Sequence, residues 1–184
     1  MRKHRSISAP GTAARPARAL RTPATARDRE HGQLHGFAVP GSLRAEHAEI
    51  HEALEKAARA PGAVGEAARD LARVLHPHFV REEQIALPPL ALLRPLADGN
   101  AEPWMRGVLP MTDSLRDELP RMLREHVDIG AAARHLERVA READHAEVEE
   151  LARKLQLHAR SEEELFYPAA VLVGDLVRAR TRPG

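Results

Sequence analysis

The chain contains no cysteine among its 184 residues, which excludes disulfides and every zinc or iron–sulfur site that depends on thiolates. Any bound metal must therefore be held by nitrogen and oxygen atoms. Aromatic residues make up only 3% of the chain, whereas hydrophobic residues make up 43%. The apolar surface thus comes mainly from Ala, Leu and Val, and together with many Arg and Glu this composition favours helices. We expect an all-α protein.

Long apolar segments are also absent. No uninterrupted apolar run approaches about 18 residues, the length expected of a membrane-spanning helix. Residues 1–30 lack the apolar middle region of a secretory signal. These absences predict a cytoplasmic protein with no membrane partner.

Charge is distributed unevenly along the chain. Residues 1–40 carry a net charge of +6, so that the remainder carries −5 of the total of +1. The stretch "GTAARPARALRTPATARDR" has too little apolar content to fold and no aromatic ring for stacking on bases. We therefore predict that residues 1–40 form a basic, disordered leader without a nucleic-acid partner, and that residues 41–180 form the folded domain.

The body of the chain contains an internal repeat. "AEHAEI" at Ala45–Ile50 matches "REHVDI" at Arg124–Ile129, and "HFVREEQIALP" at His78–Pro88 matches "HARSEEELFYP" at His158–Pro168. Such self-similarity indicates two hairpins of the same plan. We predict an up-down four-helix bundle with helices near 42–60, 64–92, 112–140 and 144–179. The matching Pro88 and Pro168 predict a kink or break in both halves.

Polar residues interrupt the stripe of apolar residues that recurs at alternating steps of four and three along each predicted helix. The four stripes are Leu43, His47, Ile50, Leu54 and Ala57; Leu71, Leu75, His78, Glu82, Ile85 and Pro89; Leu115, Leu119, Met122, His126, Ile129, Ala133 and Leu136; and Leu151, Leu155, His158, Glu162, Leu165, Ala169 and Leu172. Buried carboxylates and imidazoles are costly unless they are paired or bound to a metal. No Lys or Arg lies on these stripes, so metal coordination is the favoured explanation.

The spacing agrees with a metal site. Residues four apart on a helix point to the same side, as do His78 with Glu82 and His158 with Glu162. One such pair per half, with one histidine from the facing helix, predicts three ligands per half and a pseudo-twofold site for two metals. Nitrogen and carboxylate ligands favour iron, with manganese or zinc as alternatives.

These motifs resemble the hemerythrin-like, or HHE cation-binding, family over residues 40–178. The resemblance implies a non-heme di-iron centre that binds or senses dioxygen, nitric oxide or peroxide, or handles iron in stress response. The ligands that it implies are His47, His78, Glu82, His126, His158 and Glu162, with the two glutamates bridging the metals.

Two departures distinguish the chain from the oxygen-carrying members. Met122 stands where those members have a second histidine, and the pair in the last helix is His158-xxx-Glu162 instead of a longer pair ending in aspartate. An additional coordination position is therefore open, which favours redox reactivity or sensing over stable oxygen carriage. His51 is an alternative source of the missing nitrogen, although a surface role is favoured.

Other residues and functions remain open. A di-iron enzyme with peroxidase- or ferroxidase-like activity and a purely structural metal are the alternative functions. We expect Glu83 and Glu163 to be solvated or to orient histidines. For Tyr167 we favour a packed ring beside Pro168 over a redox role, and we expect Trp104 to cover one end of the bundle.

Overall fold

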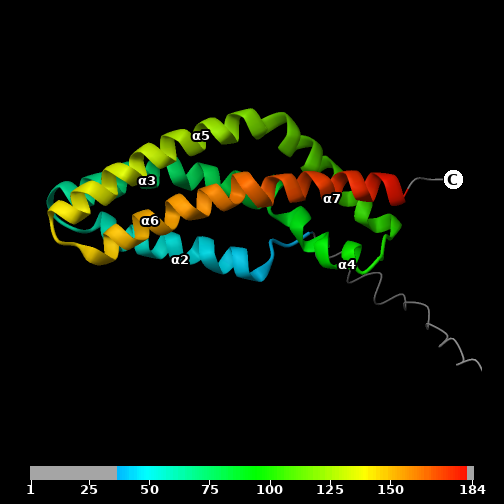
Figure 1. Cartoon of the computed structure of the whole chain (residues 1–184), viewed down its shortest axis with the longest axis horizontal. Helices are drawn as coiled ribbons and strands as arrows, with labels where there is room; N and C mark the ends of the chain where they lie inside the picture. The colour runs from blue at the N-terminus through cyan, green and yellow to red at the C-terminus, as the bar shows by residue number, and fades with distance from the viewer. Residues whose placement is uncertain (1–36, 182–184) are drawn as a thin grey trace, which may run out of the picture.

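The computed structural model describes residues 37–181, in which no strand occurs. Four helical segments run side by side in an up-down bundle: α2 (Gly41–Ala58), α3 (Gly62–Arg81), α5 (Leu109–Glu142) and α6 (Ala146–Ser161) (Figure 1). α7 (Tyr167–Arg180) continues the line of α6. The predicted all-α four-helix bundle is confirmed. The predicted disordered leader lies outside the described residues, apart from 37–40.

Tight turns close the two hairpins at one end of the bundle. α3 begins at Gly62, whose φ of 70° favours glycine, immediately after Pro61. In the second hairpin Asp144, with a φ of 58°, separates α5 from α6. The two hairpins correspond to the two halves of the sequence repeat. None of the described helices has the length and apolarity needed to span a membrane.

The opposite end is built from short elements that connect the hairpins. After α3 come a π-helical turn (Glu82–Ala86), a 3-10 helix (Pro88–Leu92), α4 (Leu93–Ala97) and a second 3-10 helix (Pro103–Val108). They pack against α7 around Leu92, Met105 and Val177. Trp104 stacks on Phe37 at this end, with ring centroids 5.8 Å apart, and remains 45% exposed.

Proline affects the helices differently at each position. The helix predicted over 64–92 continues from α3 through the π turn to Ala86 and is broken before Pro88 and Pro89, which cannot donate backbone hydrogen bonds. Pro168, by contrast, is the second residue of α7, where a missing N–H is tolerated. A break at Pro88 is thus confirmed, whereas the chain continues as a helix after Pro168. Pro77 and Pro120 lie inside α3 and α5.

Matching π-helical turns occur in both halves, and the second one changes which residues are buried. They begin at Glu82 and at Glu162 (Glu162–Phe166). A π turn holds more residues than an α turn, so the residues after it are rotated about the helix axis. Leu165 and Leu172, predicted to lie in the core, are 61% and 65% exposed. Tyr167 is buried instead.

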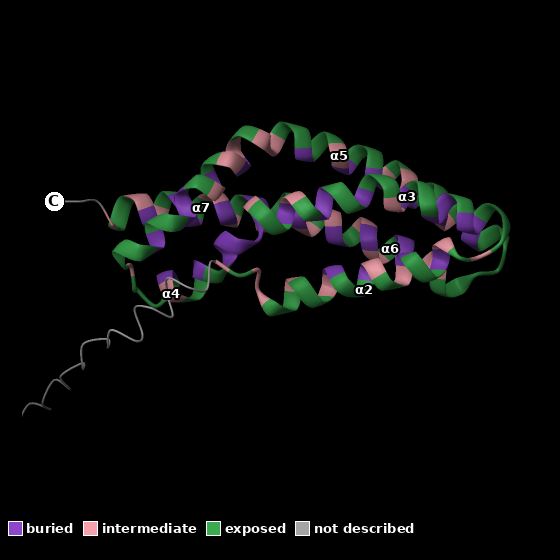
Figure 2. Ribbon diagram, turned by 180° about the vertical axis from the view of Figure 1, so that it is seen from behind, coloured by how far each residue is buried: buried purple, intermediate pink, exposed green. Residues whose placement is uncertain are grey.

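Polar residues lie between two parts of the apolar core. Towards the hairpin turns, Ile50, Leu75 and Leu155 belong to one cluster. Beyond the polar residues, Met122 and Tyr167 belong to a second cluster. The buried residues follow the inward faces of the helices along the bundle (Figure 2). A polar site therefore lies at mid-length of the bundle, enclosed by apolar side chains.

Candidate metal centre

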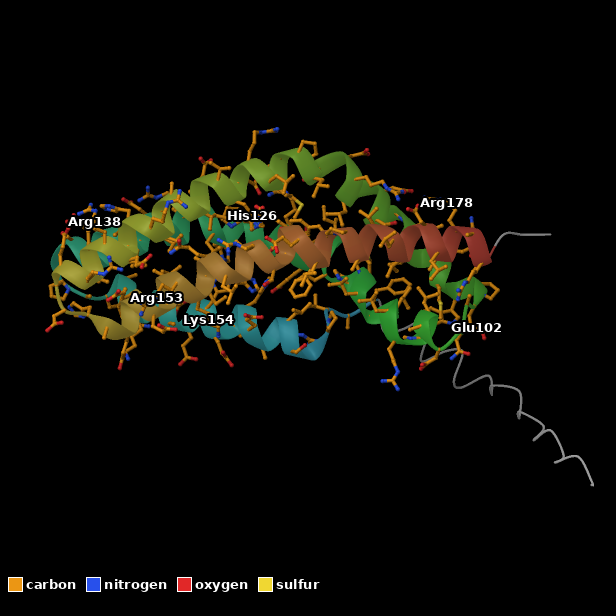
Figure 3. All side chains as sticks on the ribbon, viewed as in Figure 1. Glu102, His126, Arg138, Arg153, Lys154 and Arg178 are labelled. Atoms are coloured by element: carbon orange, nitrogen blue, oxygen red, sulfur yellow. The ribbon has the colours of Figure 1, made fainter. Side chains whose placement is uncertain are left out.

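All six residues predicted as metal ligands meet in this polar layer. Each of the six is at most 5% exposed. The histidines come one each from α2, α3, α5 and α6, and the glutamates begin the π turns that follow α3 and α6. His126 lies between the helices, whereas Arg138, Arg153 and Lys154 lie on the outside of the bundle (Figure 3). The agreement with the sequence stripes arises because all six positions precede the rotation caused by the π turns.

The side chains form two groups whose possible ligand atoms lie within 4.8 Å of one another. One group contains His78, Glu82, His126 and Glu162, and the other contains His47, His158 and Glu162. In each group the two histidines come from different hairpins. This differs from the prediction, in which each half of the repeat contributed three ligands to one metal. The reason is that α5 places His126 against His78 of α3, while His47 of α2 faces His158 of α6.

A carboxylate lies at the outer ring nitrogen of every one of these histidines. The Nδ1–oxygen distances are 3.1 Å for His47–Glu83, 2.8 Å for His78–Glu125, 2.8 Å for His126–Glu163 and 3.3 Å for His158–Glu46. Ionised carboxylates only accept hydrogen bonds, so Nδ1 carries the proton. A ring protonated only at Nδ1 directs the lone pair of Nε2 into the site, the arrangement typical of metal-bound histidine.

The site contains buried polar atoms without hydrogen-bond partners. These are Nε2 of His47 and His158, Oε2 of Glu82 and Oε1 of Glu162. His158 Nε2 and Glu162 Oε1 are 2.8 Å apart, but they do not align as a hydrogen bond. Buried polar atoms are normally satisfied. Inward lone pairs and carboxylate oxygens are the donor set that a divalent transition metal requires, so the residues present fit such an ion.

Charge in the site is shared unequally between the two glutamates. Burial opposes ionisation of Glu162, but the neighbouring rings of His126, His158 and His47 hold its pKa well below its ordinary value of 4.5. Burial and the charge of Glu162 raise the pKa of Glu82, despite its contact with His78. In the metal-free protein one carboxylate is thus firmly ionised, while its neighbour holds a proton more readily.

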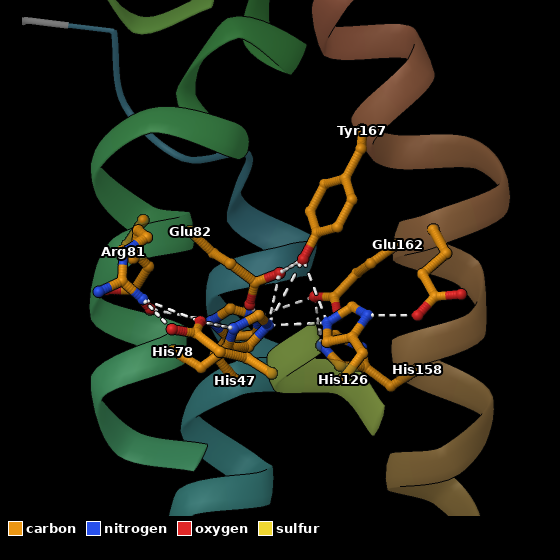
Figure 4. Close-up of polar contacts among 11 residues, drawn as sticks. His47, His78, Arg81, Glu82, His126, His158, Glu162 and Tyr167 are labelled. Carbon is orange, nitrogen blue, oxygen red and sulfur yellow. Dashed lines mark hydrogen bonds and ion pairs between the residues drawn. The ribbon is translucent and has the colours of Figure 1, made fainter. Parts of the chain in front are cut away.

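Tyr167 points its hydroxyl into the site (Figure 4). It donates a short hydrogen bond to Glu82 Oε1, and its oxygen lies 3.2 Å from His126 Nε2. Burial raises the pKa of Tyr167, so the phenol is neutral. The ring itself is packed in the second apolar cluster, as predicted. The contact of its hydroxyl with the site was not predicted, and it arises because the π turn at Glu162 rotates Tyr167 into the site.

Three further sequence predictions concern carboxylates and His51. Glu83 and Glu163 contact histidines, as expected of orienting groups. Glu46 and Glu125 also contact histidines of the site, which was not predicted. The signal was present in the sequence, because Glu46 precedes His47 in the first half of the repeat and Glu125 precedes His126 in the second. His51 lies in neither ligand group and faces His76 instead, with ring centroids 5.4 Å apart.

A four-helix bundle with inward-facing histidines and glutamates from all four segments defines a cation-binding helical domain. The chain belongs to the hemerythrin family: the model described as "Hemerythrin HHE cation binding domain" matches residues 38–170. This confirms the family predicted from the sequence motifs. No curated protein and no solved structure gives a significant match to the chain.

Proposed function

We propose that the chain binds two non-heme iron ions, with manganese or zinc as possible substitutes. His78, His126 and Glu82 would hold one ion and His47 and His158 the other, while Glu162, which belongs to both groups, would be shared. The observation that carries this proposal is the set of buried ring nitrogens and carboxylate oxygens without hydrogen-bond partners. Divalent cations would satisfy these atoms together.

The charges around the two central glutamates favour a bound metal cation, because no Lys or Arg side chain within residues 37–181 neutralises them. The cations of Arg81 and Arg121 contact Glu125 at the edge of the site, and none of the described Lys or Arg residues forms an ion pair with Glu82 or Glu162. A buried carboxylate without a positive partner destabilises a protein by several kcal/mol, roughly the cost of removing one member of a buried ion pair. A metal supplies the missing positive charge.

We further propose that a coordination position left open by the protein takes dioxygen, nitric oxide or peroxide. Met122 is fully buried in the apolar cluster beside the site and offers no nitrogen to a metal. Iron in such a site supplies reversible binding of these small molecules or one-electron chemistry towards them. The protein supplies the apolar side chains beside the site and the neutral Tyr167 hydroxyl, which can donate a hydrogen bond.

A redox enzyme is the second candidate function. It is favoured by Tyr167, which brings a hydroxyl group within 3.4 Å of His78 Nε2 and 3.2 Å of His126 Nε2. Peroxidase- or ferroxidase-like turnover would need an electron donor or acceptor from outside the chain. Steady consumption of peroxide, measured with an added one-electron donor, would distinguish this function from simple binding.

Metal analysis and optical spectroscopy test the proposal. After anaerobic reconstitution with Fe(II) we expect about two irons per chain, and the same count in the exposed-residue control Glu164→Ala. On cycling between dioxygen and nitrogen, the spectrum should fail to return to its starting form, since the protein lacks a seventh ligand at Met122. A well-folded sample with one iron or none would contradict the dinuclear site, and a fully reversible spectrum would indicate oxygen carriage.

A further inference from the structure

A third pair of histidines lies outside the metal centre, between α2 and α3. His51 of α2 is partly buried, and His76 of α3 is exposed. Their ring centroids are 5.4 Å apart, with an angle of 68° between the ring planes. His135, another histidine outside the centre, differs from this pair: it accepts a hydrogen bond from Arg138 on its own helix.

The geometry of this pair matches that of the two pairs in the centre. His47 and His158 have centroids 5.1 Å apart at 73°, and His78 and His126 have centroids 4.5 Å apart at 62°. Two imidazoles on one tetrahedral ion, with metal–nitrogen distances of about 2.0–2.1 Å, place their centroids roughly 5.2 Å apart. The separation of 5.4 Å between His51 and His76 falls close to that value.

The sequence around His51 repeats the spacing used in the core. Glu55 follows His51 by four residues on α2, as Glu82 follows His78, so the two side chains project from the same side of the helix. Glu55 is 75% exposed, and its ion pair with Arg59, at 3.7 Å, is a surface contact of small free energy. Its carboxylate is therefore free to move towards an ion held by the two histidines.

The environment of His51 also favours a ligand. Its ring packs edge-on against Phe79 at 5.2 Å between ring centroids, which fixes the ring plane. Burial, together with the neighbouring His76 and His47, lowers the pKa of His51, so the ring is neutral near pH 7 with a lone pair available. Glu55 and Glu83 add negative charge nearby.

We propose that His51 and His76, assisted by Glu55, form a separate surface site for one divalent transition-metal ion. Imidazole nitrogen with carboxylate oxygen suits zinc, copper, nickel or iron, and water completes the coordination of an exposed ion. The ion would link α2 to α3 across the first hairpin. This site uses none of the six residues of the core.

Zinc binding by the full chain tests the proposal. Equilibrium dialysis against Zn²⁺ should give one ion fewer per chain for His76→Ala than for the unsubstituted protein, and no loss for the control His135→Ala. His76 is exposed, so its substitution leaves the fold intact. The test uses only the difference in zinc content between the two proteins, so it does not depend on how many ions the six-residue centre binds. Equal zinc content in His76→Ala and the unsubstituted chain, or an equal loss in His135→Ala, would overturn the proposal.

Nuclear magnetic resonance gives a second readout that needs no substitution. During a zinc titration the ring signals of His51 and His76 should shift together with the same saturation, whereas those of His135 stay in place. Movement of His76 without His51 would mean that a single surface histidine binds zinc, and it would also overturn the two-histidine site.

Discussion

The Nε2 atoms of His78 and His126 lie 2.7 Å apart in the interior of the bundle. Nδ1 of each ring is held by a carboxylate, from Glu125 and Glu163 respectively. If both rings were neutral and protonated at Nδ1, their two Nε2 lone pairs would face and repel each other. The metal-free site must therefore keep a shared proton on one ring, and a metal ion would replace that proton. Competition between protons and metal is thus built into the site.

Removal of both central carboxylates should abolish metal binding. We expect Glu82→Ala combined with Glu162→Ala to leave no tightly bound iron, because Glu162 belongs to both ligand groups. Glu83→Ala removes only a contact to His47 Nδ1 and should weaken binding by about 10- to 100-fold without abolishing it. Iron content after reconstitution and desalting measures both effects. An equal loss in the two proteins would mean that the assignment of ligands is wrong.

Glu125 should tune the metal position that contains His78. Burial raises the pKa of this carboxyl, but His78, Arg81 and Arg121 outweigh burial and lower it, so Glu125 is a charged acceptor. Glu125→Gln removes the charge and should reduce metal affinity by about 10- to 100-fold, measured by competition with a chelator.

Glu118→Gln is the matched control for Glu125→Gln. Glu118 pairs with the same Arg81 at 2.9 Å but contacts no histidine of the site. It should leave metal affinity unchanged. Similar losses in the two variants would assign the effect to Arg81 and the surface ion pairs instead of to His78.

The hydroxyl of Tyr167 should contribute to the stability of the metal-free protein and to the spectrum of the iron-loaded protein. Tyr167→Phe keeps the stacking on His126, where the centroids are 5.6 Å apart, and removes the hydrogen bond to Glu82. The free energy of unfolding of the metal-free protein should fall by about 1–3 kcal/mol, the range for a buried acceptor that loses its donor. The iron count should stay at two while the spectrum changes. An unchanged spectrum would place the hydroxyl outside the reactive part of the site.

The metal-free and metal-loaded proteins should respond oppositely to pH. Burial opposes the charged forms of His78 and His158, but the nearby carboxylates of Glu82 and Glu162 raise the pKa of both above 6.5. A group with a raised pKa stabilises the fold fully below its unfolded pKa, and this contribution is lost as the pH rises through the folded pKa. The metal-free protein should therefore unfold at lower denaturant at a pH of about 8.5 than at about 6.

Metal affinity should rise over the same pH interval, since the ion replaces protons on the histidines. Chelator competition at the two pH values measures it. Parallel changes in stability and affinity, both rising or both falling with pH, would contradict the shared-proton arrangement. The low pKa of Glu162 affects stability only at acid pH, below its ordinary value of 4.5, and does not disturb the comparison.

Sequence periodicity located the six candidate ligands because they lie in regular α-helix up to the glutamates, where steps of three and four keep side chains on one face. Beyond Glu82 the stripe still reaches the buried Pro89, but beyond Glu162 the prediction failed. There the π turn adds a residue and rotates the chain, so that Leu165 faces solvent and Tyr167 faces the site. Periodicity alone does not reveal a π turn, since hydrogen bonds between backbone groups define it.

The sequence by itself determined the all-α class, the two hairpins, the family and the set of four histidines and two glutamates, because these depend on composition, repeat and local helix geometry. Tertiary structure decided how the histidines pair across the hairpins, which carboxylates hold their Nδ1 atoms, and that Tyr167 enters the site. Those features depend on which faces of neighbouring helices pack together. The separation of 5.4 Å between His51 and His76 likewise arises only when α2 lies against α3.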